Sequence, residues 1–97
     1  MTTLEATVDA ALADAAKRTG LKRTDLKVLI AEAVTWSDGS LGCPQPGMMY
    51  TQALVPGYRV RIRAAGKELD YHAGRMGLPM LCPEERAIPP AAGGDRI

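Results

Sequence analysis

The feature that most constrains the fold is an alternating pattern between residues 58 and 72. Tyr58, Val60 and Ile62 alternate with three arginines, and Leu69 and Tyr71 then alternate with polar residues. Successive side chains of a strand point to opposite faces, so a one-residue slip would move the whole apolar set to the wrong face. An even-numbered turn pairs Ile62 with Leu69 and Val60 with Tyr71. The pattern therefore predicts an antiparallel hairpin with one apolar face.

The other face of this hairpin carries charge. The same register pairs Arg63 with Glu68, Arg61 with Asp70 and Arg59 with His72. Opposite charges across a strand pair contribute about 0.2–1 kcal/mol each. Because the acids neutralise most of the arginine field, we interpret this face as a solvated charge ladder rather than a phosphate or nucleic-acid site.

Residues 2–19 have the pattern of an amphipathic helix. Thr2 and Glu5 have capping-box spacing, and Gly20 is suited to a left-handed helix end. The apolar stripe contains Leu4, Val8 and several alanines, so the helix should lie close against a sheet.

Residues 24–36 fit two secondary structures. The local pattern fits a helix, but the following Ser37-Asp38-Gly39-Ser40 is typical of a hairpin turn and needs a strand before it. We therefore interpret this segment as a strand, bulged near Glu32, with Trp36 in the core. Prolines make 42–47 an irregular loop, and 48–55 has the composition of a short strand.

These elements predict one α+β domain over residues 1–83. One N-terminal helix packs on a small antiparallel sheet of three or four strands. Residues 76–83 return Cys82 to the sheet edge, and the Pro- and Gly-rich residues 84–97 form a flexible C-terminal tail.

Charge and hydropathy exclude several classes of function. The formal net charge is +1, which gives no strong signal for nucleic acid or an anionic membrane. No apolar run approaches the roughly 20 residues that span a bilayer. The first residues lack the basic and apolar regions of a signal peptide, so we expect a cytoplasmic protein.

Cys43 and Cys82 leave two interpretations open. A cytoplasmic location favours free thiols, whereas a small core without Phe favours a stabilising disulfide. Together with His72 the two cysteines could form a redox or soft-metal site, although no ligand spacing supports a metal. A Cys–His pair without a third, orienting group is a weak catalytic signal, so we expect no enzyme and no cofactor.

The segment 41–50 is the best candidate for a binding site. Prolines and glycine stiffen it, and it presents Gln45, Met48, Met49 and Tyr50. A stiff loop loses little conformational entropy on binding, which raises affinity. We therefore expect a non-enzymatic interaction module, such as an adaptor, accessory subunit or inhibitor-like protein. Its partner would be another protein or a second copy of the chain.

The sequence from Trp36 to Ala53, WSDGSLGCPQPGMMYTQA, resembles a family of small uncharacterised bacterial proteins with a W-x-DG-x-LGCP-x-PG-x-x-Y-x-Q-A core. The resemblance extends over about residues 33–83 and includes PGYR, a Y-H pair and a late Cys. It implies a helix followed mostly by strands, and it carries no activity. A weaker similarity is to small bacterial protease inhibitors, which also combine an N-terminal helix, a Pro-Gly-Met loop, a basic hairpin strand and two Cys.

Overall fold

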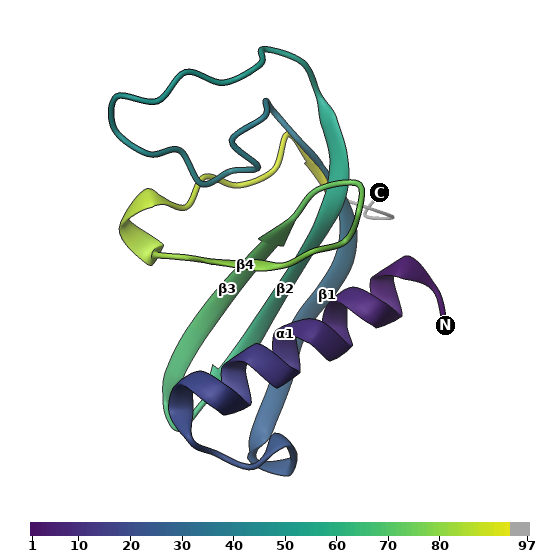
Figure 1. Cartoon of the computed structure of the whole chain (residues 1–97), viewed down its shortest axis with the longest axis vertical. Coiled ribbons are helices and arrows are strands. Elements are labelled where there is room, and N and C mark those ends of the chain that lie inside the picture. The colour runs from purple at the N-terminus through teal and green to yellow at the C-terminus, as the bar shows by residue number, and fades with distance from the viewer. Residues whose placement is uncertain (94–97) are drawn as a thin grey trace.

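The structure is a computed structural model that describes residues 1–93, and it confirms the predicted α+β class. One helix, α1 (Thr3–Thr19), covers one face of an antiparallel sheet (Figure 1). The strands are β1 (Leu26–Trp36), β2 (Val55–Ala64), β3 (Lys67–Ala73), β4 (Met80–Cys82) and the two-residue β5 (Ala92–Gly93), with the 3-10 turns η1 (Arg23–Asp25) and η2 (Glu84–Arg86). The order across the sheet is β4-β3-β2-β1-β5.

Helix α1 begins and ends as the sequence predicts. The Glu5 amide donates to Thr2 Oγ1 and the Thr2 amide donates to Glu5 Oε1, which completes the capping box. Gly20 ends the helix with φ 74°. Ala11 and Ala15 are fully buried against the sheet. Their small side chains allow the close approach that the alanine-rich stripe predicts.

The hairpin of β2 and β3 has the predicted register. Ile62 lies opposite Leu69 and Val60 opposite Tyr71, and their side chains form the core beneath α1. Arg63 pairs with Glu68 straight across, as predicted, whereas the other two ion pairs run diagonally: Arg59 binds Asp70, and Arg61 binds Glu68. This face is also not solvated throughout, because Asp70 and His72 are buried. The prediction of a solvated ladder is therefore wrong at the end of the hairpin nearest Trp36.

Strand β1 confirms the strand interpretation of residues 24–36, but its bulge lies at Leu29 rather than near Glu32. From Val28 to Ile30 the chain advances two residues while β2 advances one. The extra residue moves Ile30 and Glu32 away from the face that packs on α1. The bulge thus moves the Glu32 side chain off the apolar face, on which its carboxylate would have no polar partner.

Residues 37–54 form one irregular loop, so two predicted features are wrong. Asp38-Gly39 makes no hairpin, and 48–54 contains no strand; β1 pairs instead with β2, from Trp36 opposite Val55 onward. The Asp38 carboxylate accepts hydrogen bonds from both the amide and the hydroxyl of Ser40, which closes a local turn. The chain then continues through Leu41 and Gly42 at positive φ instead of returning along β1.

The segment after β4 follows the sheet and the loop. The Ile88 amide donates to Gly42 O and the Ala91 amide to Thr35 O, both at 2.8 Å. Strand β5 then pairs with Val34 and Thr35. The domain limits 1–83 and 84–97 stay a prediction, and residues 94–97 lie outside the described residues.

A second, smaller core lies on the sheet face away from α1, and Trp36 is its centre. The indole is fully buried, as predicted, and its Nε1–H donates to Ala73 O at 2.9 Å. The indole ring lies over Gly57 of β2, and Gly42 of the long loop packs against the ring from the other side. A Cβ added to Gly42 would lie 2.5 Å from the indole ring, and one added to Gly57 would lie 2.1 Å from Ala73 O.

We predict that Gly57→Ala lowers the free energy of unfolding by about 3 kcal/mol, because the methyl group would meet a backbone oxygen that cannot move without breaking the β2–β3 ladder. The midpoint of thermal unfolding should fall by roughly 10–20 °C. Gly39→Ala is the matched control, since its Cβ would meet nothing closer than 3.4 Å. Equal midpoints for the two variants would contradict this account of the second core.

Candidate functional site

His72 lies at the base of the second core and is 1% exposed. Its ring stacks on Trp36, with centroids 4.4 Å apart and planes 22° from parallel. Nδ1 lies 2.6 Å from Leu41 O and Nε2 lies 3.0 Å from Asp70 Oδ2. Both ring nitrogens are therefore engaged with the protein's own oxygens. The buried ring is thus held by contacts within the fold.

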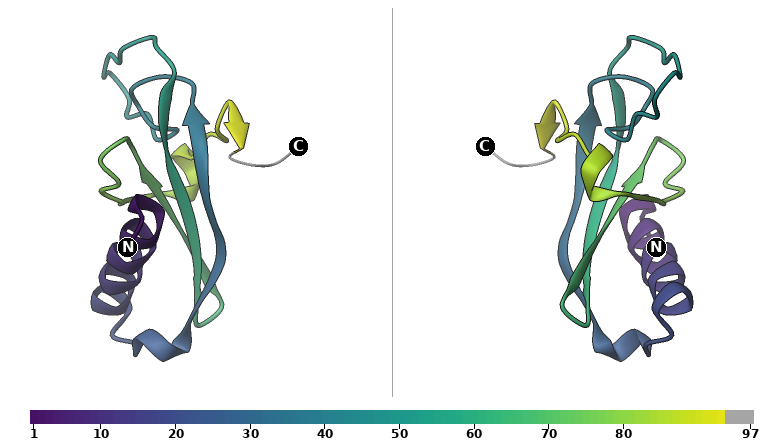
Figure 2. Two further views of the ribbon diagram at one scale, coloured as in Figure 1. Left: turned by 90° about the vertical axis from the view of Figure 1, so that its right-hand side faces the viewer. Right: turned by 90° about the vertical axis from the view of Figure 1, so that its left-hand side faces the viewer.

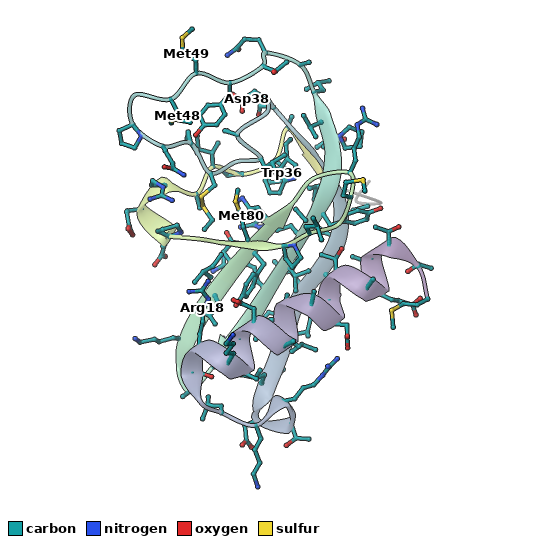
Figure 3. The ribbon with its side chains drawn as sticks, viewed as in Figure 1. Arg18, Trp36, Asp38, Met48, Met49 and Met80 are labelled. Atoms are coloured by element: carbon teal, nitrogen blue, oxygen red, sulfur yellow. A yellow bond between two sulfur atoms is a disulfide. The ribbon has the colours of Figure 1, made fainter. Side chains whose placement is uncertain are left out.

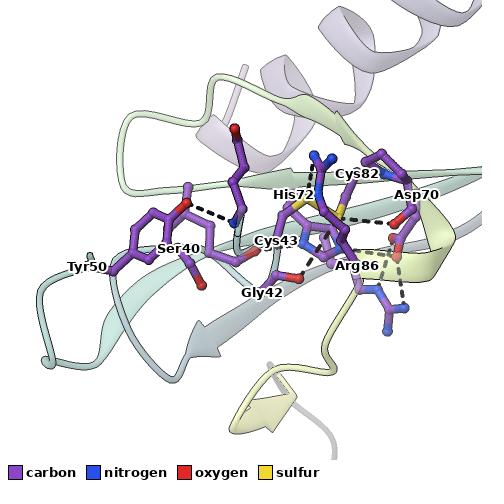
Figure 4. The surroundings of a disulfide bond; sticks show 12 residues. Ser40, Gly42, Cys43, Tyr50, Asp70, His72, Cys82 and Arg86 are labelled. Atoms are coloured by element: carbon purple, nitrogen blue, oxygen red, sulfur yellow. Dashed lines mark hydrogen bonds and ion pairs between the residues drawn. A yellow bond between two sulfur atoms is a disulfide. The ribbon is translucent and has the colours of Figure 1, made fainter. Parts of the chain in front are cut away.

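Asp70 joins His72 to the charged face of the hairpin (Figure 4). Arg59 Nε donates to Asp70 Oδ1 at 3.1 Å, and Arg59 Nη2 to Oδ2 at 3.2 Å. Burial raises the pKa of Asp70, but the hydrogen bonds from His72 and Arg59 outweigh it, so the pKa lies below its usual value. The carboxylate is thus held charged between two partners. The residue opposite Asp70 on β4 is Cys82, whose sulfur is bonded to Cys43.

Cys43 and Cys82 form a disulfide across 39 positions of the sequence. This outcome decides between the two interpretations that the sequence left open. Both residues are nearly inaccessible, at 4% and 2% exposed. The Arg86 guanidinium lies above the bond, with Nη2 3.8 Å from Cys43 Sγ. The disulfide joins the long loop to β4 at the sheet edge.

The structure brings Cys43, Cys82 and His72 into one region, as the metal hypothesis requires. The two sulfurs are bonded to each other, however, and both nitrogens of His72 have oxygen partners. Within residues 1–93, no cluster of three or more His, Cys, Asp or Glu side chains is arranged to hold a metal ion.

A cavity of about 360 Å³ lies on the charged face beside Cys82. Arg59 and Arg61 line it, and so do Glu68, Asp70 and Glu84. The first four of these side chains already form ion pairs with one another. Its charges are therefore largely compensated within the protein, and the cavity has no excess charge to attract a simple anion.

The 41–50 loop holds its predicted residues in a defined arrangement. The Gln45 amide donates to the Tyr50 hydroxyl at 3.0 Å, and the Met48 amide donates to Gln45 O at 3.2 Å. Met48 is 59% exposed and Met49 is 95% exposed. The Met49 side chain points away from the rest of the molecule (Figure 3). The loop thus presents apolar side chains on a backbone tied to itself.

A second exposed apolar loop, residues 74–79, was not predicted from the sequence. It lies between α1 and the long loop (Figure 1), and Met76 and Leu78 are 82% and 76% exposed. The signal was present, because apolar residues in a Gly- and Pro-rich segment cannot all enter a regular core. We interpreted the segment only as the return to the sheet edge, which β4 confirms for Met80–Cys82.

None of the helices in residues 1–93 has both the length and the apolar character needed to cross a bilayer. The fold and the region around the disulfide define a small disulfide-bonded α+β domain with exposed methionine-bearing loops. The chain belongs to the DUF8738 family, a domain of unknown function, whose family model matches residues 8–82.

Membership agrees with the expected uncharacterised family, whereas the particular motif and the protease-inhibitor similarity are not confirmed. No curated protein matches the chain. No solved structure matches it either.

We predict that the protein loses stability as the pH falls below about 4, in part through Asp70. Its pKa is lower in the folded than in the unfolded state, so its contribution is present above the unfolded pKa and is lost as the pH falls through the folded pKa. Asp70→Asn should be less stable at pH 7 and should show a shallower loss between pH 5 and pH 2. Denaturant unfolding at each pH measures both effects. Parallel curves for the two proteins would show that Asp70 contributes nothing to the acid sensitivity.

Proposed function

We propose that this protein is a small non-enzymatic interaction module that binds another protein through the 41–50 loop. The observation that carries the proposal is the exposure of Met49, 95%, on a loop whose flanks are fixed. Soluble proteins rarely expose neighbouring apolar side chains without a use for them. Methionine is suited to such a surface because its flexible, polarisable side chain adapts to the shape of a partner.

The anchoring of the loop supports the same proposal. Cys43 is bonded to β4, the Gly42 carbonyl accepts from Ile88, and the Gly39 amide donates to Thr51 O at 2.9 Å. These links fix the base of the loop on both sides. A preorganised loop gives up little entropy when it binds, so a few side chains can supply most of the affinity. Adaptors, accessory subunits and inhibitors all use this arrangement.

The environment of the reactive groups favours an interaction module over the alternative, a redox or soft-metal protein using Cys43, Cys82 and His72. Thiol exchange requires attack on an accessible sulfur, and both cysteines are at least 96% buried, at 4% and 2% exposed. A buried bond of this kind is suited to a structural role.

The disulfide also leads us to propose an oxidising compartment in place of the cytoplasmic location that we expected. Disulfides persist in oxidising surroundings and are uncommon in the reducing cytosol. A small domain gains most from such a bond, since its apolar core is limited.

We predict that Met49→Ala weakens binding to the natural partner about fivefold or more, because a central apolar contact is lost while the fold is retained. The measurement is affinity capture with tagged protein from a lysate of the cells that make it. Quantitative mass spectrometry then compares the partner lists. Titration of any captured partner against each variant gives the affinities.

Met76→Ala is the matched control, since it removes a methionine of similar exposure outside the loop. Tyr50→Phe tests the loop conformation, because it removes the hydroxyl that accepts from the Gln45 amide. Identical partner lists and affinities for the unmodified protein and Met49→Ala would refute the 41–50 loop as the binding surface.

We predict that Cys43 and Cys82 are oxidised in the cell and that the Cys43→Ala/Cys82→Ala double variant is less stable by about 4 kcal/mol, the chain-entropy estimate for a loop of this length. Alkylation of free thiols at the moment of lysis, followed by mass spectrometry, reports the redox state. Denaturant unfolding reports the stability. Two alkylated thiols would refute the oxidising compartment and would favour the redox or soft-metal alternative.

A further inference from the structure

In the part of the chain that the structure describes, the outer edge of β1 is open along most of its length. Strand β5 pairs only with Val34 and Thr35, so within residues 1–93 no strand pairs with the outer side of residues 26–33. This edge faces the viewer in the left panel of Figure 2. An open edge presents a row of unpaired amides and carbonyls to which another strand can add.

The bulge at Leu29 sets which residues direct their backbone groups outward. Thr35 does so, because its carbonyl accepts from Ala91, and alternation along the strand gives the same direction to Ala33 and Ala31. The extra residue between Val28 and Ile30 reverses the phase of the alternation. On the other side of the bulge, Val28 is therefore directed outward, and Leu26 has the same phase, although its amide already donates to Arg23 O.

We infer that two copies of this chain pair antiparallel through the open edge of β1 and form one continuous sheet. The open segment 26–33 has its midpoint between Leu29 and Ile30. A twofold axis at that point pairs each residue with the residue of the second copy that lies equally far from the midpoint on its other side. Val28 then lies opposite Ala31 of the second copy, and Leu26 opposite Ala33. Val28 and Ala31 direct both of their backbone groups outward, which is what antiparallel hydrogen bonding requires. At the end of the segment, the Leu26 amide already donates to Arg23 O, so only its carbonyl can pair with Ala33. Without the bulge this register would place outward groups opposite inward ones.

The charges on this edge are complementary in the same register. It places Lys27 opposite Glu32 of the second copy, and the twofold axis repeats the pair. Both residues lie on the sheet face away from α1, since Lys27 is opposite Arg63 and Glu32 opposite Arg59 in the sheet. Among residues 1–93 neither makes an ion pair within the chain.

The helix face of the edge carries an apolar groove. Helix α1 crosses the sheet so that its N-terminal end lies beyond β1 (Figure 1). A mainly apolar groove of about 400 Å³, lined by Leu4, Val8 and Ala31 among others, lies beneath this end. Val28, which is 36% exposed, lies on the helix face opposite Ala31 of the other copy and would enter that copy's groove.

A charge-swap experiment on the full chain tests the inference. Sedimentation velocity across a concentration series up to about 1 mM measures the dimer dissociation constant, Kd. Lys27→Glu and Glu32→Lys should each raise Kd about tenfold, because each turns two attractive pairs into repulsive ones. The double variant Lys27→Glu/Glu32→Lys should restore the Kd of the unmodified chain. Lys67→Glu, at the far edge of the sheet, is the control for a charge change of equal size.

Amide hydrogen exchange locates the contact. The amides of Val28 and Ala31 should become more protected as the concentration rises, whereas those of Lys67 and Glu68 should not change. Thermal unfolding of each variant separates lost dimerisation from lost folding.

A monomer at every concentration would overturn the inference. The bulge and the charge of Lys27 would then be features that prevent the edge of β1 from pairing with another strand. A dimer whose Kd does not respond to the charge swaps would equally overturn it. Restoration of Kd by the double variant, with protection confined to the edge amides, is the result that we expect.

Discussion

The hydrogen bond from the Trp36 indole to Ala73 O, made across Gly57, is the contact on which the second half of the structure depends. It places a large flat ring on the sheet face that α1 leaves uncovered. His72 stacks beside that ring, and Gly42 packs over it. Segments far apart in the sequence therefore share one small core. The loop between β1 and β2 and the chain after β4 have fixed positions because both are attached to this core.

The cores on the two faces of the sheet are built from different kinds of side chain. Beneath α1 the core is mostly aliphatic, with Ala11 and Ala15 allowing the helix to lie close to Val60 and Ile62. On the other face, residues 1–93 supply no second α-helix and the sequence contains no Phe, so the core there uses one Trp, a stacked His and a disulfide. Small domains bury too little apolar surface to rely on a single core, and a covalent bond compensates for part of that deficit.

Local patterns in the sequence predicted the elements whose structure is decided locally. The alternation from Tyr58 to His72 gave the hairpin and its register, and Thr2 with Glu5 gave the start of α1. The pattern at Asp38-Gly39 misled us, because the turn that forms there depends on Ser40 and on the position of Trp36 beneath Gly42.

The burial of Asp70 and His72 was also missed. On the alternation alone they are solvated strand residues, whereas in the structure Leu41 O contacts the His72 ring and Asp70 is held between His72 and Arg59. Of the candidate site, the pattern left open which of Met48 and Met49 is exposed, and in the structure both are. The disulfide depended on long-range geometry, which spacing does not encode.

The disulfide would keep the two parts of the chain joined if the backbone were cut in the long loop. The segment from Cys43 to Cys82 is a closed ring of covalent bonds, and the most exposed methionine, Met49, lies inside it. A protease that cut the backbone between Met48 and Met49 would leave residues 1–48 and 49–97 still joined through the sulfurs. The nicked protein would remain one molecule of almost unchanged mass, with the two fragments joined by the bond between Cys43 and Cys82.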